Sequence, residues 1–364
     1  MNRTDPKSNA PIMMLSAGNG FIMQSEKYSR DNAGQSLKKY ILLKQGELAY
    51  NHGASKAKQF GCCYELTEPE ARIPYVYHCF KINDHEYTPF IAMALNNAKM
   101  DKQLKRLVSS SVRMDGLLNI SFEDYMSVTL HLPSSTEQKH IADFLKKIDK
   151  RIAAQEKLLA SLKKYKRGLL MHYFSDDKTQ LWTQCSVSQI GKVITGSTPP
   201  TNDRSNYDGD LLFCAPGDVG EQKYISSTEK RVSPKGFALG RPLPPNSVIV
   251  TCIGLIGKLG IAKTSMITNQ QINALVVSEG FDHEFIYYAF ENFFPEYRSK
   301  VSMQTLPILS KSEFEKLMIK VPDLDVQHKI SSHLAAMDRR IEHTQQELNA
   351  LIEHRRGIMQ QLFI

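Results

Sequence analysis

Two polar loops in the second half of the chain carry the residues best suited to reading a nucleic acid. Residues 196–202 (Gly-Ser-Thr-Pro-Pro-Thr-Asn) and 268–271 (Thr-Asn-Gln-Gln) are rich in hydroxyls and amides. Asparagine and glutamine can hydrogen-bond an adenine edge at two points, and arginine or lysine can do so with guanine. Basic side chains nearby can neutralise phosphates, which positions a protein on DNA without specifying a sequence. The candidate DNA-binding residues are Thr198, Asn202, Arg204, Lys223, Arg231, Lys258, Asn269, Gln270 and Gln271, together with Lys27, Arg30, Lys56 and Lys58 in the first half.

Each candidate also has a plainer interpretation. A single lysine or arginine is more often a solvated surface charge than a phosphate ligand. Residues 269–271 could equally form a structural amide network inside a domain. The residue types therefore predict an interface without fixing its individual contacts.

The chain contains no recognised catalytic motif. Residues 254–259 (Gly-Leu-Ile-Gly-Lys-Leu) come nearest to a phosphate-binding loop, but they lack its spacing and its magnesium-binding hydroxyl. Residues 313–316 (Glu-Phe-Glu-Lys) contain the E-x-K pattern of nucleases on a short amphipathic helix, where a solvated helical face is the favoured interpretation. The 11 histidines show no metal-ligand spacing. We therefore expect no catalytic residue, no metal site and no cofactor on this chain.

Composition favours an anionic partner and an intracellular protein. The 364 residues carry a formal net charge of +8, with a pI of about 9.0, which favours nucleic acid, although a mildly basic protein without such a partner remains the alternative. None of the 6 cysteines forms a C-x-x-C pair, which is typical of reduced thiols. The sequence shows neither a signal peptide nor an apolar run of membrane-spanning length. A cytoplasmic location without membrane contact is expected.

A long helix occurs twice in the sequence. Residues 132–174 align with residues 321–363 without a gap, and helices are predicted at residues 136–170 and 325–359. A repeat this long is typical of a duplicated half-molecule rather than a solenoid. Identical pairs include Pro133/Pro322, Gln138/Gln327, Asp149/Asp338, Arg167/Arg356, Gly168/Gly357 and Phe174/Phe363.

Both copies carry a narrow apolar stripe with alternating steps of four and three residues, as in coiled coils. An ordinary amphipathic helix on a globular core is the alternative, but core helices average about 11–12 residues. Polar residues interrupt the stripe at equivalent places, Gln155/Thr344 and Lys166/Arg355, and such positions usually fix register. The predicted helix-pair seam consists of Ile141, Leu145, Ile148, Ile152, Leu159 and Leu162 with Ile330, Leu334, Met337, Ile341, Leu348 and Leu351.

Short strands and helices are predicted outside the long helices. Ser121 with Asp124 and Ser310 with Glu313 have the spacing of helix caps. Residues 175–180 form a polar linker. Strands are predicted at residues 75–82, 126–132, 193–195, 211–214, 248–252, 259–262, 274–277 and 318–321, and helices begin at 90 and 283.

The expected fold class is α+β, with two globular domains of mixed α/β structure separated by two long helices. The helices would pair as an antiparallel coiled coil, so that the internal repeat is related by a pseudo-twofold axis. The expected domains are residues 1–132, 133–174 (first long helix), 175–321 and 322–364 (second long helix).

Several segments of this chain are similar to type I restriction-modification specificity (S) subunits. Residues 132–141 and 321–330 resemble the start of that family's conserved regions, and each is followed by a long helix that ends in Arg-Gly-Leu-Leu (167–170) or Arg-Gly-Ile-Met (356–359). The second globular segment resembles the family's target recognition domain. It shares, in order, Trp182, Ile190-Gly191, residues 196–199, residues 256–258 and residues 268–271.

The resemblance implies a non-catalytic subunit in which each target recognition domain reads one half of a bipartite site on double-stranded DNA. The paired helices would set the gap between the half-sites and dock two methyltransferase (M) subunits, with motor-nuclease (R) subunits completing the enzyme. S-adenosylmethionine, ATP and magnesium are then implied for the partner subunits alone. A rod of roughly 50 Å agrees with a spacer of about one and a half turns of duplex.

One departure concerns the first domain. By the repeat, its counterpart of residues 182–196 would precede Met1, so we expect a domain shortened at its N-terminus. A counterpart of residues 268–271 is also missing, which suggests that the two domains read different half-sites.

Two other functions remain open from the residues. A coiled-coil adapter without DNA specificity would show neither steep salt dependence nor sequence preference. A nuclease using Glu313 and Glu315 would cut unmethylated DNA with magnesium.

Overall fold

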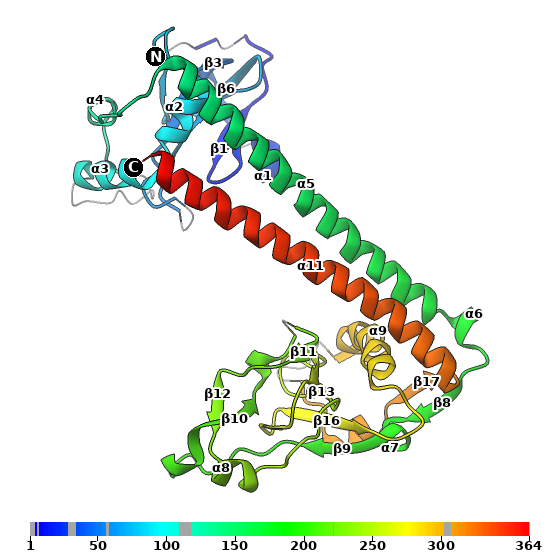
Figure 1. Ribbon diagram of the computed structural model, residues 1–364. Helices are drawn as coiled ribbons and strands as arrows, with labels where there is room; N and C mark the ends of the chain where they lie inside the picture. The colour runs from blue at the N-terminus through cyan, green and yellow to red at the C-terminus, as the bar shows by residue number, and fades with distance from the viewer. Residues whose placement is uncertain are drawn as a thin grey trace. The chain divides into compact units, whose positions relative to one another are not determined.

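Two helices of 39 residues each, α5 (Ser135–Tyr173) and α11 (Leu324–Leu362), dominate the computed structural model (Figure 1). The structure describes residues 4–5, 7–27, 34–55, 58–108, 118–220, 222–301 and 307–363. The chain forms two compact units: unit 1 is Met1–Glu156 with Gln346–Ile364, and unit 2 is Lys157–Gln345. The division falls inside the long helices rather than at their ends, so each unit contains part of both.

The core of unit 2 is a five-stranded sheet with the strand order β11-β14-β13-β16-β9. β13 lies antiparallel to both neighbours and consists of β-branched residues that are fully buried. A second sheet has the order β12-β10-β15, with β10 parallel to β15. The strands are β8 (Thr183–Ser186), β9 (Gly191–Thr195), β10 (Tyr207–Cys214), β11 (Tyr224–Ile225), β12 (Lys230–Val232), β13 (Val248–Thr251), β14 (Leu259–Ala262), β15 (Met266–Thr268), β16 (Ile272–Val277) and β17 (Met318–Val321).

Helix α9 covers this sheet with an aromatic face. Phe285, Tyr288 and Phe290 are fully buried and belong to one cluster with Val248 and Val250 of β13. The burial of such large rings supplies much of the apolar area that stabilises unit 2. The helices of unit 2 outside the long pair are α6 (Asp176–Thr179), α7 (Val187–Ile190), η2 (Arg204–Asn206), η3 (Pro216–Asp218), α8 (Pro234–Leu239), α9 (His283–Val301) and α10 (Lys311–Lys316).

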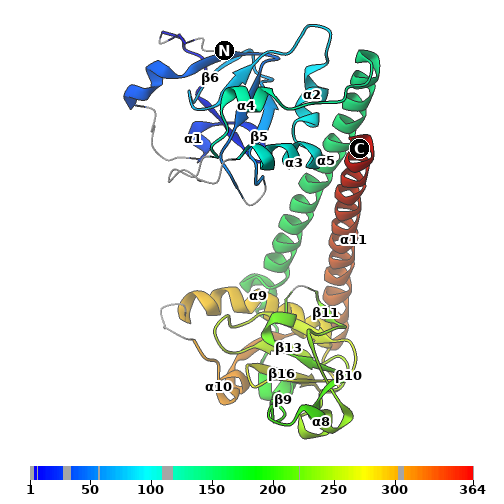
Figure 2. The ribbon, with the colours of Figure 1, turned by 90° about the vertical axis from the view of Figure 1, so that its left-hand side faces the viewer.

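Unit 1 is built from small antiparallel sheets, β1-β2, β3-β6 and β5-β4-β7, with helices beside them (Figure 2). Tyr50 of β4 stacks on Tyr125 of α4, with ring centroids 3.9 Å apart, and both rings are buried. The elements are β1 (Met13–Ser16), β2 (Gly20–Met23), α1 (Gln24–Lys27), η1 (Gly34–Lys39), β3 (Ile41–Lys44), β4 (Leu48–Asn51), β5 (Cys62–Glu65), β6 (Glu70–Ile73), β7 (His78–Phe80), α2 (Thr88–Ala94), α3 (Ala98–Leu107) and α4 (Phe122–Met126).

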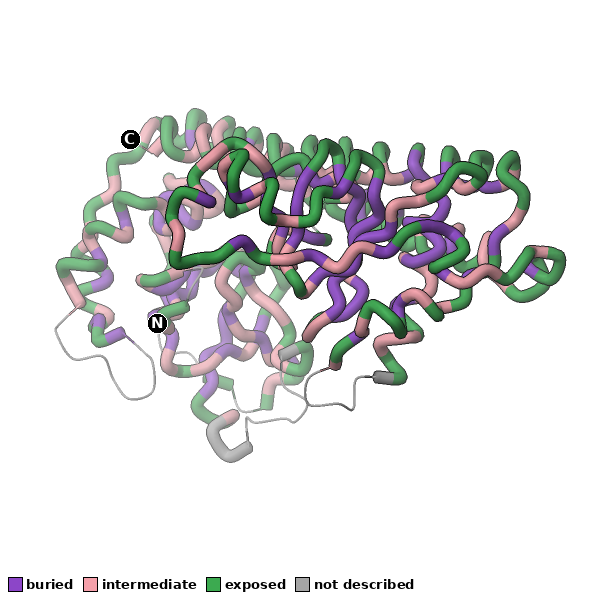
Figure 3. Tube along the Cα trace, turned by 90° about the horizontal axis from the view of Figure 1, so that it is seen from below, coloured by how far each residue is buried: buried purple, intermediate pink, exposed green. Residues whose placement is uncertain are grey.

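One stripe of each long helix is shielded from solvent. Buried and exposed residues alternate along both helices (Figure 3), and all the residues of the predicted seam are buried or half-buried. Leu145 and Leu334, which are equivalent in the repeat, are both fully buried.

The same ion pair joins the two helices in each unit. In unit 1, Arg355 makes a bidentate contact with Asp149, with Nη2 3.1 Å from Oδ2. In unit 2, Nζ of Lys166 lies 2.7 Å from Oδ1 of Asp338, which is equivalent to Asp149 in the repeat. A second contact in unit 1 joins Gln155 to Glu347 at 2.7 Å. A second contact in unit 2 joins the Tyr173 hydroxyl to Nδ1 of His333 at 2.5 Å. Two contacts in each unit require the helix segments there to run antiparallel, and the ion pairs explain the polar residues at positions 166 and 355.

A buried glutamine ties the start of each long helix to its own unit. Gln138 and Gln327 are each 1% exposed. The Gln327 amide donates to the Pro322 carbonyl at 2.9 Å and accepts from the backbone N–H of Asp282, just before α9, at 2.9 Å. Gln138 repeats both contacts, with the carbonyl of Pro133 and the N–H of Tyr87, just before α2. Helices α2 and α9 are therefore counterparts.

The C-terminal end of each long helix packs on α2 or α9 as well. In each unit, the short helix that is tied to the glutamine of one long helix also contacts the end of the other. Phe174, directly after α5, lies 5.6 Å from the Phe285 ring of α9 in unit 2. Its repeat equivalent Phe363, directly after α11, lies 5.3 Å from Phe90 of α2 in unit 1. Each unit thus combines the start of one long helix with the end of the other.

Two local predictions are wrong, and a third segment has more structure than expected. Residues 127–132 form no strand, because no described segment pairs with them, whereas their counterpart β17 pairs antiparallel with β8. The strand predicted at residues 75–82 contains only β7, since residues 75–77 form a turn and bend. The predicted linker at residues 175–180 contains the helical turn α6.

The Gln327→Ala variant is expected to destabilise unit 2 by about 1–3 kcal/mol, because it leaves the buried N–H of Asp282 without its acceptor. Trp182, the only tryptophan, packs on Phe174 and Phe285, so its fluorescence during urea denaturation reports on unit 2. Exposed Gln346→Ala on the same helix is the control. Equal midpoints for the two variants would contradict the proposed role of the buried amide.

Candidate nucleic-acid interface

The two loops singled out in the sequence lie against each other in unit 2. The N–H of Ser197 donates to the Thr268 carbonyl at 2.8 Å, and the N–H of Gly196 donates to the Ile272 carbonyl at 3.0 Å. The Thr198 hydroxyl donates to Oε1 of Gln270 at 2.6 Å. Thr198 and Gln270 are both exposed, so the hydroxyl and amide of this pair are available at the surface.

Glycine at position 196 allows this close approach. A Cβ added there would lie 2.2 Å from the Asn269 carbonyl oxygen and 2.3 Å from that of Thr268. Such contacts are far below van der Waals separation, so any larger side chain would push the loops apart. Gly196 is therefore required for the two loops to pack against each other.

Asn206, the last residue of η2, and Tyr207, the first residue of β10, hold the first loop at its prolines. The hydroxyl of Tyr207 donates to the Pro199 carbonyl at 2.6 Å, and the Asn206 amide donates to the Pro200 carbonyl at 3.0 Å. Asn206 is 1% exposed. Neither residue is among the candidates from the sequence, since no sequence pattern distinguishes a buried asparagine from an exposed one. They leave Asn202 exposed on a loop that is fixed at its base.

Arg204 and Arg231 are exposed cations on the same unit. Arg204 begins η2, and Arg231 lies on β12, where its guanidinium donates weakly to the Asp210 carbonyl at 3.4 Å. Lys235 binds the Asp203 carboxylate at 2.8 Å, and this contact lowers the pKa of Asp203 to about 2. Asp203 therefore stays ionised and partly offsets the positive charge beside the loop.

Lys223 is bound inside unit 2, against the expectation that it contacts phosphate. Its side chain is 13% exposed, and Nζ lies 3.0 Å from Oε1 of Glu284 and 2.9 Å from the hydroxyl of Tyr288. The ammonium also lies 4.5 Å from the Tyr288 ring centroid. Burial alone would raise the pKa of Glu284, but hydrogen bonds from Tyr224 and Lys223 hold it below its usual value. Lys223 therefore compensates the charge of a half-buried carboxylate.

The remaining described candidates are held by other groups of the protein. Asn269 and Gln271 bond each other at 3.2 Å, which is the structural amide network that the sequence left open. Lys258 is half-buried beside Gly220. In unit 1, Nζ of Lys58 donates to the Asn96 carbonyl at 2.8 Å. Lys27 ends α1, where only the backbone is described, and Arg30 and Lys56 lie outside the described residues.

The E-x-K pattern at residues 313–316 has a structural role at Glu313. The Ser310 hydroxyl and N–H donate to Oε2 of Glu313 at 2.7 and 2.9 Å, so the two residues form a capping box at the start of α10. The hydrogen bond from the Ser310 hydroxyl lowers the pKa of Glu313. Within the described residues there is no cluster of histidine, cysteine, aspartate and glutamate that could hold a metal ion.

This architecture defines a class of protein with two repeated units of mixed helix and strand content. Each unit contains the start of one long helix and the end of the other. The family model for the type I restriction modification DNA specificity domain matches residues 43–164 and 180–354. These two segments cover most of the sequence, and the chain therefore belongs to this family.

Curated relatives match over part of their length. The chain is 30% identical over 178 residues to the type I restriction enzyme MjaIX specificity subunit of Methanocaldococcus jannaschii, covering 47% of this chain and 41% of that protein. It is 29% identical over 108 residues to the HindI specificity subunit of Haemophilus influenzae, covering 29% of this chain and 24% of that protein. The matches thus span less than half the length of either relative.

Solved structures share the fold. The S subunit of a type I restriction-modification system from M. genitalium is 14% identical, with a TM-score of 0.60, covering 99% of this chain and 90% of that one. A chain solved in work on assembly and conformational transition of the type I R-M system is 16% identical, with a TM-score of 0.58, covering 100% and 94%. No helix in the described part of the chain is long and apolar enough to cross a membrane.

Replacing Lys223 by methionine is expected to destabilise unit 2 by about 2 kcal/mol near neutral pH, because the ionised Glu284 loses its cation. The penalty should shrink as pH falls through the lowered pKa of Glu284, since a protonated carboxyl does not need the ammonium. Urea midpoints from Trp182 fluorescence, measured from pH 7 to pH 4, check both parts. A penalty that grows on acidification would exclude this role.

Proposed function

We propose that this chain is the sequence-reading specificity subunit of a type I restriction-modification enzyme and that it binds double-stranded DNA without catalysing a reaction. The observation that carries the proposal is the duplicated architecture together with the two loops that meet at Thr198 and Gln270. The formal net charge of +8 agrees with a polyanionic partner.

The exposed pair Thr198–Gln270 and the nearby Asn202 supply the groups that read base edges in this proposal. Amides and hydroxyls on a fixed loop lose little conformational freedom on binding, which favours specificity. Arg204 and Arg231 supply phosphate contacts that position the loops on the duplex.

The helix pair acts as the spacer between the two reading units. The predicted seam and the equivalent ion pairs at Asp149–Arg355 and Lys166–Asp338 favour an antiparallel coiled coil with a pseudo-twofold repeat. The pair also docks two M subunits, while R subunits complete the enzyme. S-adenosylmethionine, ATP and magnesium belong to those partners, and this chain binds no cofactor.

The proposal is tested by co-expressing the chain with its M subunit in a host without adenine methylation and mapping methylated adenines across the genome. A bipartite motif with a fixed spacer is expected. If a stable complex methylates nothing, or if no complex forms, the proposed recognition of a DNA sequence is wrong. Failure to form a complex would favour a coiled-coil adapter.

A heptad inserted into each long helix makes the same experiment a measurement of the spacer. Insertions between residues 156 and 157 and between 345 and 346 leave both ion pairs intact, because each pair lies wholly within one unit. Each helix lengthens by about 10 Å, so the mapped spacer should grow by about 3 base pairs while both half-sites stay unchanged. Altered half-sites with an unchanged spacer would contradict the spacer role.

Phosphate contacts are tested by salt dependence. In Arg204→Ala and in Arg231→Ala, the magnitude of the slope of log K against log salt should fall by about 1. Each variant should lose nearly the same affinity for specific and for unrelated DNA. Lys223→Met is the matched control, because the Lys223 ammonium is held inside unit 2 and should leave the slope unchanged. Fluorescence anisotropy with labelled duplexes measures both, and identical slopes in all three variants would remove the arginines from the interface.

A further inference from the structure

The turn that carries Gln270 in unit 2 has a structural counterpart in unit 1, although the sequence of unit 1 shows no match to residues 268–271. The equivalence begins at the strands β4 and β13. Each is preceded by a tight turn that contains a residue with positive φ, Gly46 (79°) or Asn246 (68°). Each is also paired antiparallel on both sides, β4 with β5 and β7, and β13 with β14 and β16. β4 and β13 are therefore equivalent strands.

Strand pairing makes His78 of β7 equivalent to Asn273 of β16. His78 lies opposite Tyr50 of β4, and Asn273 lies opposite Val250 of β13. The two side chains also contact the same place in their own units. Each lies against the carbonyl of the residue just before the serine of a capping box, at 2.9 Å in unit 1 and 3.0 Å in unit 2.

The segments directly before these two residues form matching turns. Residues 74–77 and 269–272 are each closed by a hydrogen bond from the N–H of the fourth residue to the carbonyl of the first, at 3.1 and 3.2 Å. The fourth residue is buried in both turns, and the second is exposed: Tyr75 (52% exposed) in unit 1 and Gln270 in unit 2. Gln270 stays exposed although residues 196–198 pack beside it. Tyr75 therefore occupies the place of Gln270.

The turn of unit 1 is held by buried groups. Nε2 of the buried His52 lies 3.0 Å from the Val76 carbonyl oxygen. Tyr77 is 7% exposed, and its hydroxyl accepts from the N–H of Leu15 at 3.4 Å. Tyr75 therefore projects from a fixed base, which reduces the conformational freedom lost on binding.

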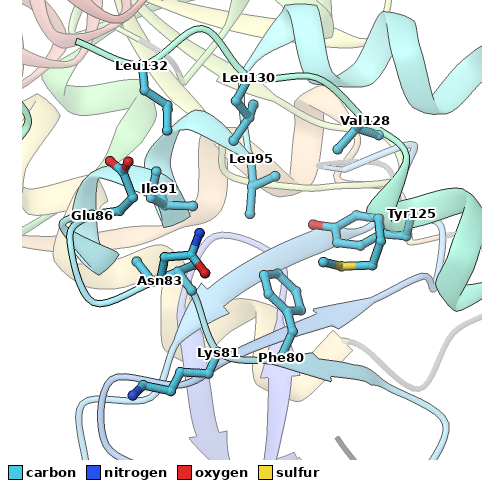
Figure 4. A pocket seen from close by; sticks show the side chains of 12 residues that line it. Phe80, Lys81, Asn83, Glu86, Ile91, Leu95, Tyr125, Val128, Leu130 and Leu132 are labelled. Atoms are coloured by element: carbon cyan, nitrogen blue, oxygen red, sulfur yellow. The ribbon is translucent and has the colours of Figure 1, made fainter. Parts of the chain in front are cut away.

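Strand β7 attaches the turn to the core of unit 1. Its last residue, Phe80, lies 5.9 Å from the ring of Tyr125 of α4, and both rings are buried. Figure 4 shows these two side chains lining an apolar groove of about 280 Å³ together with Leu95. The strand that follows the turn is thus fixed by packing at its other end.

Tyr75 has the groups that a base-contacting position needs. Its hydroxyl can donate and accept a hydrogen bond, and its ring can lie against the 5-methyl group of thymine. Nζ of the exposed Lys39, at the end of η1, lies 5.9 Å from the centroid of this ring, where it can contact a phosphate. A phenol cannot make the two-point contact with adenine that the amide of Gln270 allows.

We propose that residues 74–77 form the base-reading turn of unit 1 and that Tyr75 contacts base edges there, as Gln270 does in unit 2. The two half-sites then differ at the base pairs that these residues contact: the amide suits an adenine edge, and the phenol ring suits a thymine methyl group. This inference rests on the proposed recognition of DNA. It assigns to unit 1 a contact residue that is absent from the candidates drawn from the sequence.

Methylation mapping with the co-expressed M subunit tests the assignment one half-site at a time. The measured quantity is the ratio of methylation at matched sites to methylation at sites changed at one position. In Tyr75→Ala this ratio should fall by about tenfold at one or two positions of one half-site, while the other half-site stays unchanged. Gln270→Ala should affect the opposite half-site. Tyr75→Phe keeps the ring and should retain most of the preference for thymine.

Tyr165→Ala is the matched control. This tyrosine is 56% exposed on α5 and lies outside both turns, so its loss should leave both half-sites unchanged. Because both tyrosines are well exposed, both alanine variants are expected to fold, which circular dichroism checks.

The motif of the unsubstituted chain separates failure of this inference from failure of the proposed function. If that chain gives a bipartite motif and Tyr75→Ala gives the same motif, the assignment of the turn is wrong and the proposed function stands. If Tyr75→Ala and Gln270→Ala alter the same half-site, the equivalence of the two turns is wrong. An unsubstituted chain that methylates nothing would overturn both the inference and the proposed function.

Discussion

The apolar stripe along each long helix is the constraint on which the rest of the structure depends. A helix of 39 residues with one apolar face is not stable alone in water, so that face must be covered along its length. In both units the antiparallel segment of the other helix lies against it, and the pairs Asp149–Arg355 and Lys166–Asp338 select one register. A slip of one helical turn would separate both charge pairs, which explains why charged residues occupy positions in an otherwise apolar stripe.

The two ends of each long helix contact α2 and α9 through different interactions. At the start, a buried amide of Gln138 or Gln327 satisfies the N–H that precedes α2 or α9, so orientation is set by directional hydrogen bonds. At the end, Phe363 or Phe174 packs on the same helix through ring contacts. The repeated residues thus preserve the contacts of the long helices with α2 and α9, while the neighbouring surfaces of the two units differ. In unit 2, β8 pairs with β17, whereas no described segment pairs with residues 127–132 of unit 1.

The polar loops depend on this framework through the sheets of unit 2. Residues 196–202 leave β9, and residues 268–271 connect β15 to β16, so strand pairing brings them together. The contact between Thr198 and Gln270 is therefore a consequence of topology. Burial divides the basic candidate residues of unit 2 into two groups: Arg204 and Arg231 face solvent, while Lys223 neutralises Glu284 among tyrosine rings. Charge counts alone cannot make this distinction.

The sequence by itself determined the duplicated helices, their apolar seam, the helix caps at Ser121 and Ser310, and most strands of the five-stranded sheet, because these depend on periodicity and neighbouring residues. Only the tertiary structure decided the rest. Residues 127–132 match the strand β17 in pattern but form no strand, because a strand requires a partner for its backbone groups. Lys223 is a residue type expected at the surface, yet Glu284 and Tyr288, both distant in sequence, hold its ammonium inside unit 2. Partners of that kind are set by long-range packing, which no local pattern encodes.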